Sequence, residues 1–136
     1  MKIYLACPYS HPNASVRQLR FLAASRIAGE LIRQGLLVYS PITHGHVIGL
    51  TSQFISGSWD FWQAHCQSFI AWADAVKVVN IPGLETSIGV RAELALAASR
   101  GLPIDILDRK YCLQFLRAAR PLTLLSQEED TLISKT

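Results

Sequence analysis

Residues 3–40 read IYLACPYSHPNASVRQLRFLAASRIAGELIRQGLLVYS, and this stretch decides the fold. Residues 3–7 and 36–40 are short apolar runs, each followed by a proline. Strands that are buried on both faces lose the polar alternation, so both runs predict strands of a parallel sheet. Between them, apolar residues recur at helical spacing after a capping residue, either Asn13 or Ser15. The stretch therefore predicts a strand-helix-strand unit with a right-handed crossover.

The rest of the chain continues this alternation. Residues 41–58 contain one proline and three glycines without a sustained period, which predicts a long loop of the functional kind. The other expected elements are the first helix ending at Gly35, a helix at 58–72, a strand at 75–79, a helix from Thr86 or Ser87 to Gly101, a strand at 103–107, a helix at 109–119 and an edge strand at Leu122–Leu125. This order predicts an open, mainly parallel, Rossmann- or flavodoxin-like α/β sheet of four or five strands flanked by helices. We expect a single domain over residues 1–126 and a disordered polar tail over residues 127–136.

The chain is small, apolar and weakly charged. It has 136 residues, of which 50% are hydrophobic and 17% are charged, and its formal net charge is +3. This length supports one core, and the weak charge gives no case for a nucleic-acid partner. No apolar run approaches the ~20 residues of a membrane span, and no secretory signal is evident, so we expect a cytoplasmic protein without a membrane partner. The three cysteines are widely spaced and odd in number, which favours reduced, mostly buried thiols.

Ligands of open α/β sheets bind beyond the carboxyl ends of the strands. Three segments of this sequence are expected there, namely Pro8–His11, residues 40–58 and Asn80–Ser87. Ser10 in the first segment is a candidate substrate contact. Asn80 in the third is another, although an asparagine at this point can equally cap a turn. We therefore expect the catalytic and ligand-binding residues in or near these three segments.

The segment SIGVRAE at residues 87–93 carries the strongest chemical signal. Helical spacing places Glu93 one turn beyond Gly89 on the same face, and helical side chains lean toward the amino end. A glycine in the first turn leaves room for a ligand ring, and the free N–H groups of that turn attract an anion. A phosphate at Ser87 and a sugar over Gly89 would bring a sugar carbon to Glu93. The alternative is a solvent-facing glutamate in an ordinary amphipathic helix.

Several motifs resemble those of the nucleoside 2-deoxyribosyltransferase-like superfamily. They are IYLAxPYS at residues 3–10, Ala73-Asp74 before the third strand, SxGxxxE at 87–93, and PxxHxH at 41–46 with WxxW at 59–62, the last two being typical of a small bacterial and phage branch. The resemblance covers residues 2–107 and implies cleavage of the N-glycosidic bond of a nucleoside or nucleotide. Carried over to this sequence, it makes Glu93 the nucleophile and Tyr9 its positioning partner.

The same resemblance narrows the substrate. Superfamily members that act on nucleoside 5′-monophosphates have serine at the position of Ser87, whereas the transferases have aspartate there. A serine beside helix-terminal N–H groups tolerates a phosphate that an aspartate would repel. We therefore expect a nucleoside 5′-monophosphate as substrate, a covalent glycosyl intermediate on Glu93, and no cofactor, since this chemistry requires no metal. The resemblance also implies a homo-oligomer, a dimer or tetramer, with sites near subunit interfaces.

One position departs from the superfamily pattern. Cys66 stands where the superfamily usually has a catalytic aspartate, eight residues before the position of Asp74. A thiol is a weak proton donor, so Asp60 and His65 become the alternatives for protonating the leaving base. Two other functions stay open: a nucleoside 2-deoxyribosyltransferase, in which a second base replaces water, and a non-catalytic nucleotide-sensing module.

Two further pairs are candidate ligand contacts. On an extended segment, His44 and His46 would point the same way and suit zinc, but no third ligand is apparent, so we expect no metal and a base or phosphate contact instead. Trp59 and Trp62, three residues apart on a helix, suit stacking on a nucleobase and equally suit a core or subunit interface.

Overall fold

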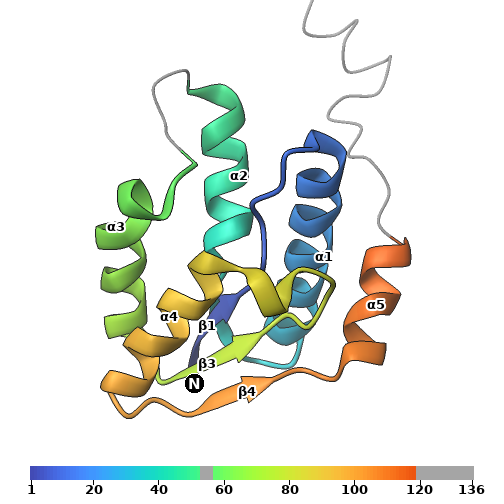
Figure 1. Cartoon of the computed structure of the whole chain (residues 1–136). Coiled ribbons are helices and arrows are strands. Elements are labelled where there is room, and N and C mark those ends of the chain that lie inside the picture. Colours follow the sequence, from blue (N-terminus) through green and yellow to red (C-terminus); the bar gives the residue numbers. More distant parts are fainter. Residues whose placement is uncertain (53–56, 119–136) are drawn as a thin grey trace, which may run out of the picture.

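The computed structural model describes residues 1–52 and 57–118 (Figure 1). Strands and helices alternate along this part of the chain, except that two helices separate the second strand from the third. In chain order the elements are β1 (Lys2–Ala6), α1 (Ala14–Arg33), β2 (Leu37–Tyr39), α2 (Pro41–Thr51), α3 (Trp59–Trp72), β3 (Ala75–Val78), the 3-10 helix η1 (Leu84–Thr86), α4 (Ile88–Ser99), β4 (Ile104–Ile106) and α5 (Arg109–Ala118).

The four strands of the described residues form one parallel sheet in the order β2-β1-β3-β4. Ile3 of β1 lies opposite Val38 of β2 on one side and opposite Ala75 of β3 on the other. From β1 the chain continues to β2 at one edge of the sheet, and from β3 it continues to β4 at the other edge. This arrangement confirms the expected open parallel α/β sheet, and it places the topological switch point between β1 and β3.

Strand β1 separates two layers of core. Tyr4 and Ala6 pack in the layer that contains α3 and α4, whereas Leu5 and Cys7 pack in the layer that contains α1 and α5. Figure 1 shows these two pairs of helices on opposite sides of the sheet. Successive side chains of a strand point to opposite faces, and both faces of β1 are covered, so its residues are apolar without alternation.

Side-chain caps fix where the helices begin. Asn13, Ser58 and Ser87 each accept a backbone N–H from the first turn of α1, α3 and α4, respectively. Asn13 is thus the cap of α1, and Ser15, the other candidate, lies inside that helix. An oxygen at this position satisfies one of the N–H groups that a helix terminus leaves without a partner.

The prediction of a loop at residues 41–58 is wrong for most of this range, because α2 occupies Pro41–Thr51. The side chain of Ser40 accepts the N–H of Thr43 at 3.2 Å, and Pro41 takes a first-turn position where its missing N–H is not needed. Helix α2 then packs against α1, where the hydroxyl oxygens of Thr43 and Ser25 lie 2.8 Å apart. The cap and this packing outweigh the low helix propensity of the two glycines within α2.

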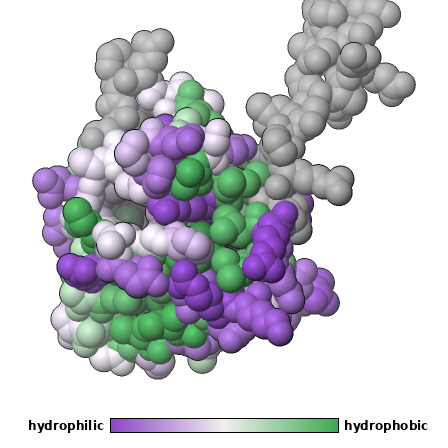
Figure 2. Space-filling view, turned by 45° about the vertical axis from the view of Figure 1, so that its right-hand side comes forward, coloured by the Kyte–Doolittle hydropathy of each residue, from purple (hydrophilic) through white to green (hydrophobic). Residues whose placement is uncertain are grey.

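Strand β4 forms an edge of the described sheet, and its residues are exposed. Ile104 and Ile106 are 39% and 54% exposed. Figure 2 shows apolar residues gathered on the lower part of the face that it turns forward, below a band of hydrophilic residues. The predicted edge strand at Leu122–Leu125 and the predicted tail at 127–136 lie outside the described residues.

The cysteines fit their prediction, since Cys7, Cys66 and Cys112 are all free and buried. Among the described helices, none combines the length and the apolar character that crossing a bilayer requires.

Candidate functional site

A cavity of about 700 Å³ lies beyond the carboxyl ends of β1 and β3, at the switch point. Its wall comes from the loop after β1, from α2, from the first half of α3, and from the segment that runs from Gly83 into α4. All three segments that the sequence placed beyond the sheet therefore contribute residues to it. The volume falls within the ~300–1,000 Å³ typical of small-molecule sites.

Glu93 of α4 is the buried carboxylate of this cavity, with only 5% of the residue exposed. The Tyr4 hydroxyl donates a hydrogen bond to its Oε2. Its Oε1 lies 3.9 Å from the point that a Cβ on Gly89 would occupy, so the carboxylate stands beside the glycine as helical spacing predicts. Burial raises the pKa of Glu93 to about 7, while the hydrogen bond from Tyr4 acts against the rise. The carboxyl group of Glu93 therefore titrates near neutral pH.

Tyr4 makes the contact with Glu93 that the superfamily resemblance led us to expect of Tyr9. It is fully buried in β1, on the face of the sheet that α4 covers. Burial raises the pKa of Tyr4, and the neighbouring Glu93 and Cys66 raise it further, so the hydroxyl stays protonated and can only donate to the carboxylate. The available signal was a tyrosine inside an aliphatic strand, because a buried hydroxyl needs a hydrogen-bond partner.

Cys66 of α3 lies beside Tyr4 and lines the cavity. Burial raises the pKa of its thiol to about 11, and hydrogen bonding with Tyr4 acts in the opposite direction. The group is therefore a neutral thiol at physiological pH and a weak proton donor. Of the two alternative donors, Asp60 lines the cavity, whereas His65 does not and places its Nε2 3.0 Å from the Tyr39 hydroxyl.

Tyr9 and His46 form a second polar pair on the cavity wall. The Tyr9 Oη and His46 Nδ1 are 2.6 Å apart, and the His46 Nε2 lies 2.8 Å from the Oε1 of Gln18 on α1. The histidine is 5% exposed, and its ring stacks on Phe21. Burial lowers the pKa of His46, and the positive charge of Arg17 lowers it further. A buried, neutral imidazole thus joins the loop after β1 to α1 and α2.

The helical course of α2 turns its two histidines in different directions, since residues two apart on a helix are separated by roughly 200°. His46 lines the cavity, whereas His44 does not and stacks on His65 with ring centroids 5.2 Å apart. The expected common direction is wrong because it assumed an extended segment. Within residues 1–52 and 57–118, no group of three His, Cys, Asp or Glu side chains is placed to hold a metal ion.

Most of the other predicted contact residues share the cavity wall. Those among them that line it are Ser10, Trp59, Trp62, Ser87 and Gly89. The Oγ of Ser87 accepts the N–H of Val90 at 3.2 Å and so caps α4, whose amino end faces the cavity. The indole of Trp62 approaches α2 at Gly45, where a Cβ would lie 3.6 Å from it.

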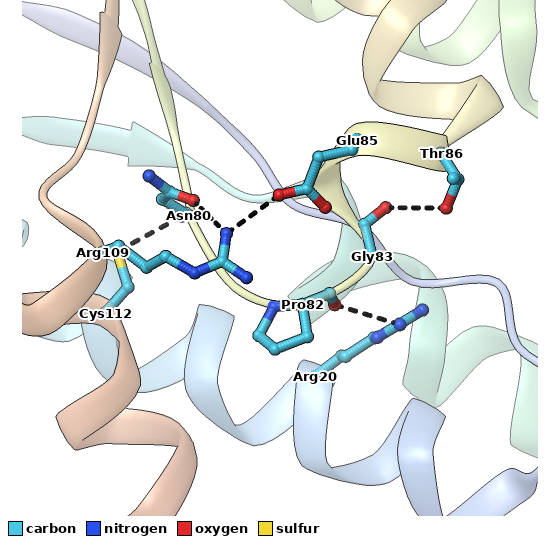
Figure 3. A network of polar contacts seen from close by, with 8 residues as sticks. All are labelled: Arg20, Asn80, Pro82, Gly83, Glu85, Thr86, Arg109 and Cys112. Carbon is cyan, nitrogen blue, oxygen red and sulfur yellow. Dashed lines mark hydrogen bonds and ion pairs between the residues drawn. The ribbon is translucent and has the colours of Figure 1, made fainter.

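Asn80 is not among the residues that line the cavity; it anchors the loop over residues 80–87 (Figure 3). Its Oδ1 accepts a hydrogen bond from Nη1 of Arg109 at 3.0 Å, and the same nitrogen lies 3.0 Å from Oε1 of Glu85. Its backbone N–H donates to the sulfur of Cys112 at 3.3 Å. Helix α5 therefore fastens this loop from the side away from the cavity, a contact that the sequence analysis missed.

Arg20 of α1 fastens the same loop from the cavity side (Figure 3). Its guanidinium donates to the carbonyl oxygens of Pro82 at 3.1 Å and Ser10 at 3.0 Å, so it joins the loops that follow β3 and β1. Gly83 has a φ of +103°, and a Cβ there would collide with this guanidinium. Within the described residues, Arg20 forms its hydrogen bonds with carbonyl oxygens and not with a carboxylate, so its positive charge remains available at the cavity wall.

A family model described as a domain of unknown function, DUF1937, matches residues 1–109 of the chain. This range contains every described residue that lines the cavity. No curated protein matches the chain significantly.

Proposed function

The chain belongs to the DUF1937 family, and we propose that it hydrolyses the N-glycosidic bond of a nucleoside 5′-monophosphate. The observation that carries this proposal is the buried Glu93 carboxylate, which Tyr4 hydrogen-bonds on one oxygen while the other lies beside Gly89 in the cavity wall. The resemblance of residues 3–10 and 87–93 to the nucleoside 2-deoxyribosyltransferase-like superfamily supports the same chemistry.

In this proposal Glu93 is the nucleophile. Its Oε1 forms a bond to the anomeric carbon of the sugar while the bond from that carbon to the base nitrogen breaks, and the base leaves with the electron pair and a proton. Tyr4 holds Oε2 and so orients the attacking oxygen toward the cavity. Water then attacks the anomeric carbon and releases the sugar phosphate and the free carboxylate. Glu93 must be ionised to attack, so a pKa of about 7 makes the first step faster as pH rises through neutrality.

The phosphate would bind at the amino end of α4. Ser87 caps this helix at the cavity wall, and the first-turn N–H groups of a helix attract anions. Arg20 lines the same cavity and adds a positive charge. Gly89, in the first turn of α4, leaves space for the sugar between this phosphate site and Glu93. Together these contacts favour a nucleotide over a free nucleoside.

Asp60 is the proposed proton donor to the leaving base. It lies on the cavity wall in the first turn of α3, and it is the carboxylate that lines the cavity besides Glu93 among the described residues. Cys66 occupies the position of the superfamily's catalytic aspartate and remains a thiol. This thiol favours a second candidate function, a module that binds a nucleotide without cleaving it.

The test is release of free base. The protein is incubated with ribo- and deoxyribonucleoside 5′-monophosphates, and the products are separated by chromatography. Base release should disappear in Glu93→Gln and persist in Glu30→Gln, a matched control in which the exposed partner of Arg33 on α1 is changed. Base exchange after addition of a second nucleobase would point to a transferase. Tight nucleotide binding without release would point to the sensor, and neither binding nor release would contradict the proposal.

A further inference from the structure

The side chain of Gln18 fixes which nitrogen of His46 carries the proton. The Oε1 of Gln18 lies 2.8 Å from His46 Nε2, and an amide oxygen can only accept a hydrogen bond. Nε2 must therefore be protonated. Gln18 does not itself line the cavity, so this contact acts from behind the wall.

The same hydrogen bond sets the direction of the next one. Burial and the nearby Arg17 favour the neutral imidazole, which carries one proton, so Nδ1 keeps a lone pair. The Tyr9 hydroxyl lies 2.6 Å from Nδ1 and must donate to it. Of the groups around this imidazole, Arg17 on α1 carries charge and Tyr9 in the loop after β1 is titratable, while Gln18 and Phe21 on α1 are neutral. No carboxylate is among these described neighbours to stabilise an imidazolium.

The Tyr9 hydroxyl therefore donates its proton to the hydrogen bond with His46. Tyr9 lines the cavity and is half-buried, and its oxygen still has lone-pair capacity. Burial raises the pKa of this hydroxyl, and the positive charge of Arg17 acts against the rise. Tyr9 therefore presents a hydrogen-bond acceptor to the cavity.

We infer that Tyr9 selects the nucleotide by accepting a hydrogen bond from a neutral donor group, either a sugar hydroxyl or an exocyclic amine of the base, and that His46 and Gln18 are the positioning residues that hold it in this role. The inference rests on the proposed function for the class of ligand. It adds a specificity determinant to the residues proposed for catalysis and for phosphate binding. A buried polar group built to pair with a ligand donor discriminates strongly against an analogue that lacks the donor.

The test measures affinity for four ligands by calorimetry. They are adenosine 5′-monophosphate, its 2′-deoxy and 3′-deoxy analogues, and purine riboside 5′-monophosphate, which lacks the amine. All measurements use the Glu93→Gln background, so that no ligand is consumed. With Tyr9 intact, one of the three deletions should weaken binding about tenfold, and the deletion that does so identifies the donor.

Two variants separate recognition from a structural role. Tyr9→Phe should bind the four ligands with nearly equal affinity. Gln18→Leu frees His46 to place its proton on Nδ1 and turn Tyr9 into a donor, so the preference should shrink although Gln18 touches no ligand. Gln114→Leu, an exposed glutamine on α5, should leave the preference unchanged. If Tyr9→Phe fails to fold, Gln18→Leu still gives the readout.

Each outcome bears on one proposal or on both. Equal affinity for all four ligands with Tyr9 intact, or a preference that survives in both variants, would overturn this inference. Nucleotide binding without base release by the unmodified chain contradicts the proposed hydrolysis. In that case the differences in affinity among the four ligands still test the role of Tyr9. Failure of every nucleotide to bind overturns both.

Discussion

The cavity has two walls that are built on different physical principles. Its inner wall, which contains Cys66 and Glu93, is buried and is held by core packing and by the hydrogen bond that Tyr4 donates to Glu93. Its loop at residues 80–87 lies nearer the surface and is held by arginine contacts from α1 and α5. Burial tunes the carboxyl group at the inner wall, whereas the arginines fix the position of the loop. Substitutions at the inner wall should therefore change the ionisation of Glu93 and the activity, whereas substitutions in the loop should change its stability.

Glu93→Gln should have the largest effect on activity, a loss of at least about a thousandfold in base release, because the nucleophile is removed. The same variant should be more stable than the unmodified chain at alkaline pH. The pKa of Glu93 is raised in the folded protein from an ordinary 4.5 to about 7, so the folded state binds the proton more tightly. The unmodified chain then loses up to about 3 kcal/mol of its free energy of unfolding as pH rises from roughly 4.5 to 7. Urea denaturation at pH 5 and pH 8 measures this loss, which should be absent in Glu93→Gln; an equal loss in both proteins would contradict the buried carboxylate.

Gly83→Ala should have the largest effect on stability in the loop, about 2 kcal/mol, because backbone strain combines with displacement of the Arg20 guanidinium from its hydrogen bonds. The residue has a φ of +103°, and the added Cβ would collide with Arg20. Gly35→Ala is a matched control, since Gly35 has a φ of +93° with no atom within 4 Å of its Cβ position. The control should lose only about 1 kcal/mol. Equal losses in urea denaturation would show that Arg20 simply moves aside.

Tyr4→Phe should lower base release at pH 7 by about ten- to a hundredfold while the protein stays folded. Loss of the donor to Oε2 removes a stabiliser of the carboxylate, so the pKa of Glu93 should rise above its value of about 7. The pH profile of kcat/KM reports this as a shift of the acidic limb to higher pH. Tyr39→Phe is the control, because its hydroxyl pairs with His65 outside the cavity. An unchanged acidic limb in Tyr4→Phe would mean that Glu93 does not control the rate.

Arg109→Ala should have the smallest effect on the free energy of unfolding, because its ion pair with Glu85 is exposed and exposed ion pairs contribute little. Loss of its hydrogen bond to Asn80 should make this effect larger than that of Arg117→Ala, an exposed arginine on the same helix. Amide hydrogen exchange over residues 80–87 should rise in Arg109→Ala only. The same exchange rate in both variants would show that α5 does not restrain the loop.

Local spacing was enough to predict the parallel sheet and the position of Glu93 beside Gly89. The sheet follows from short apolar runs that alternate with helical segments, and the position of Glu93 follows from the 3.6-residue period of a helix; both are visible in the sequence itself. Tyr4 was missed because its hydroxyl is hidden within a continuous apolar run, and its partner Glu93 is 89 residues away.

The error over α2 has a different cause. Its two glycines suggest a loop, and only the cap at Ser40 and the packing on α1 favour a helix. The mistaken direction of the two histidines follows from it. The contacts of Arg109 were beyond prediction because they depend on where α5 docks, which no local period specifies.

Arg20 also has a dynamic consequence. Its single guanidinium holds Ser10 in one loop and Pro82 in the other, and its backbone belongs to the long helix α1. Neither loop can swing outward without breaking hydrogen bonds that also steady its neighbour, so their fluctuations should be correlated. A shift of one loop on ligand binding should therefore be accompanied by a shift of the other.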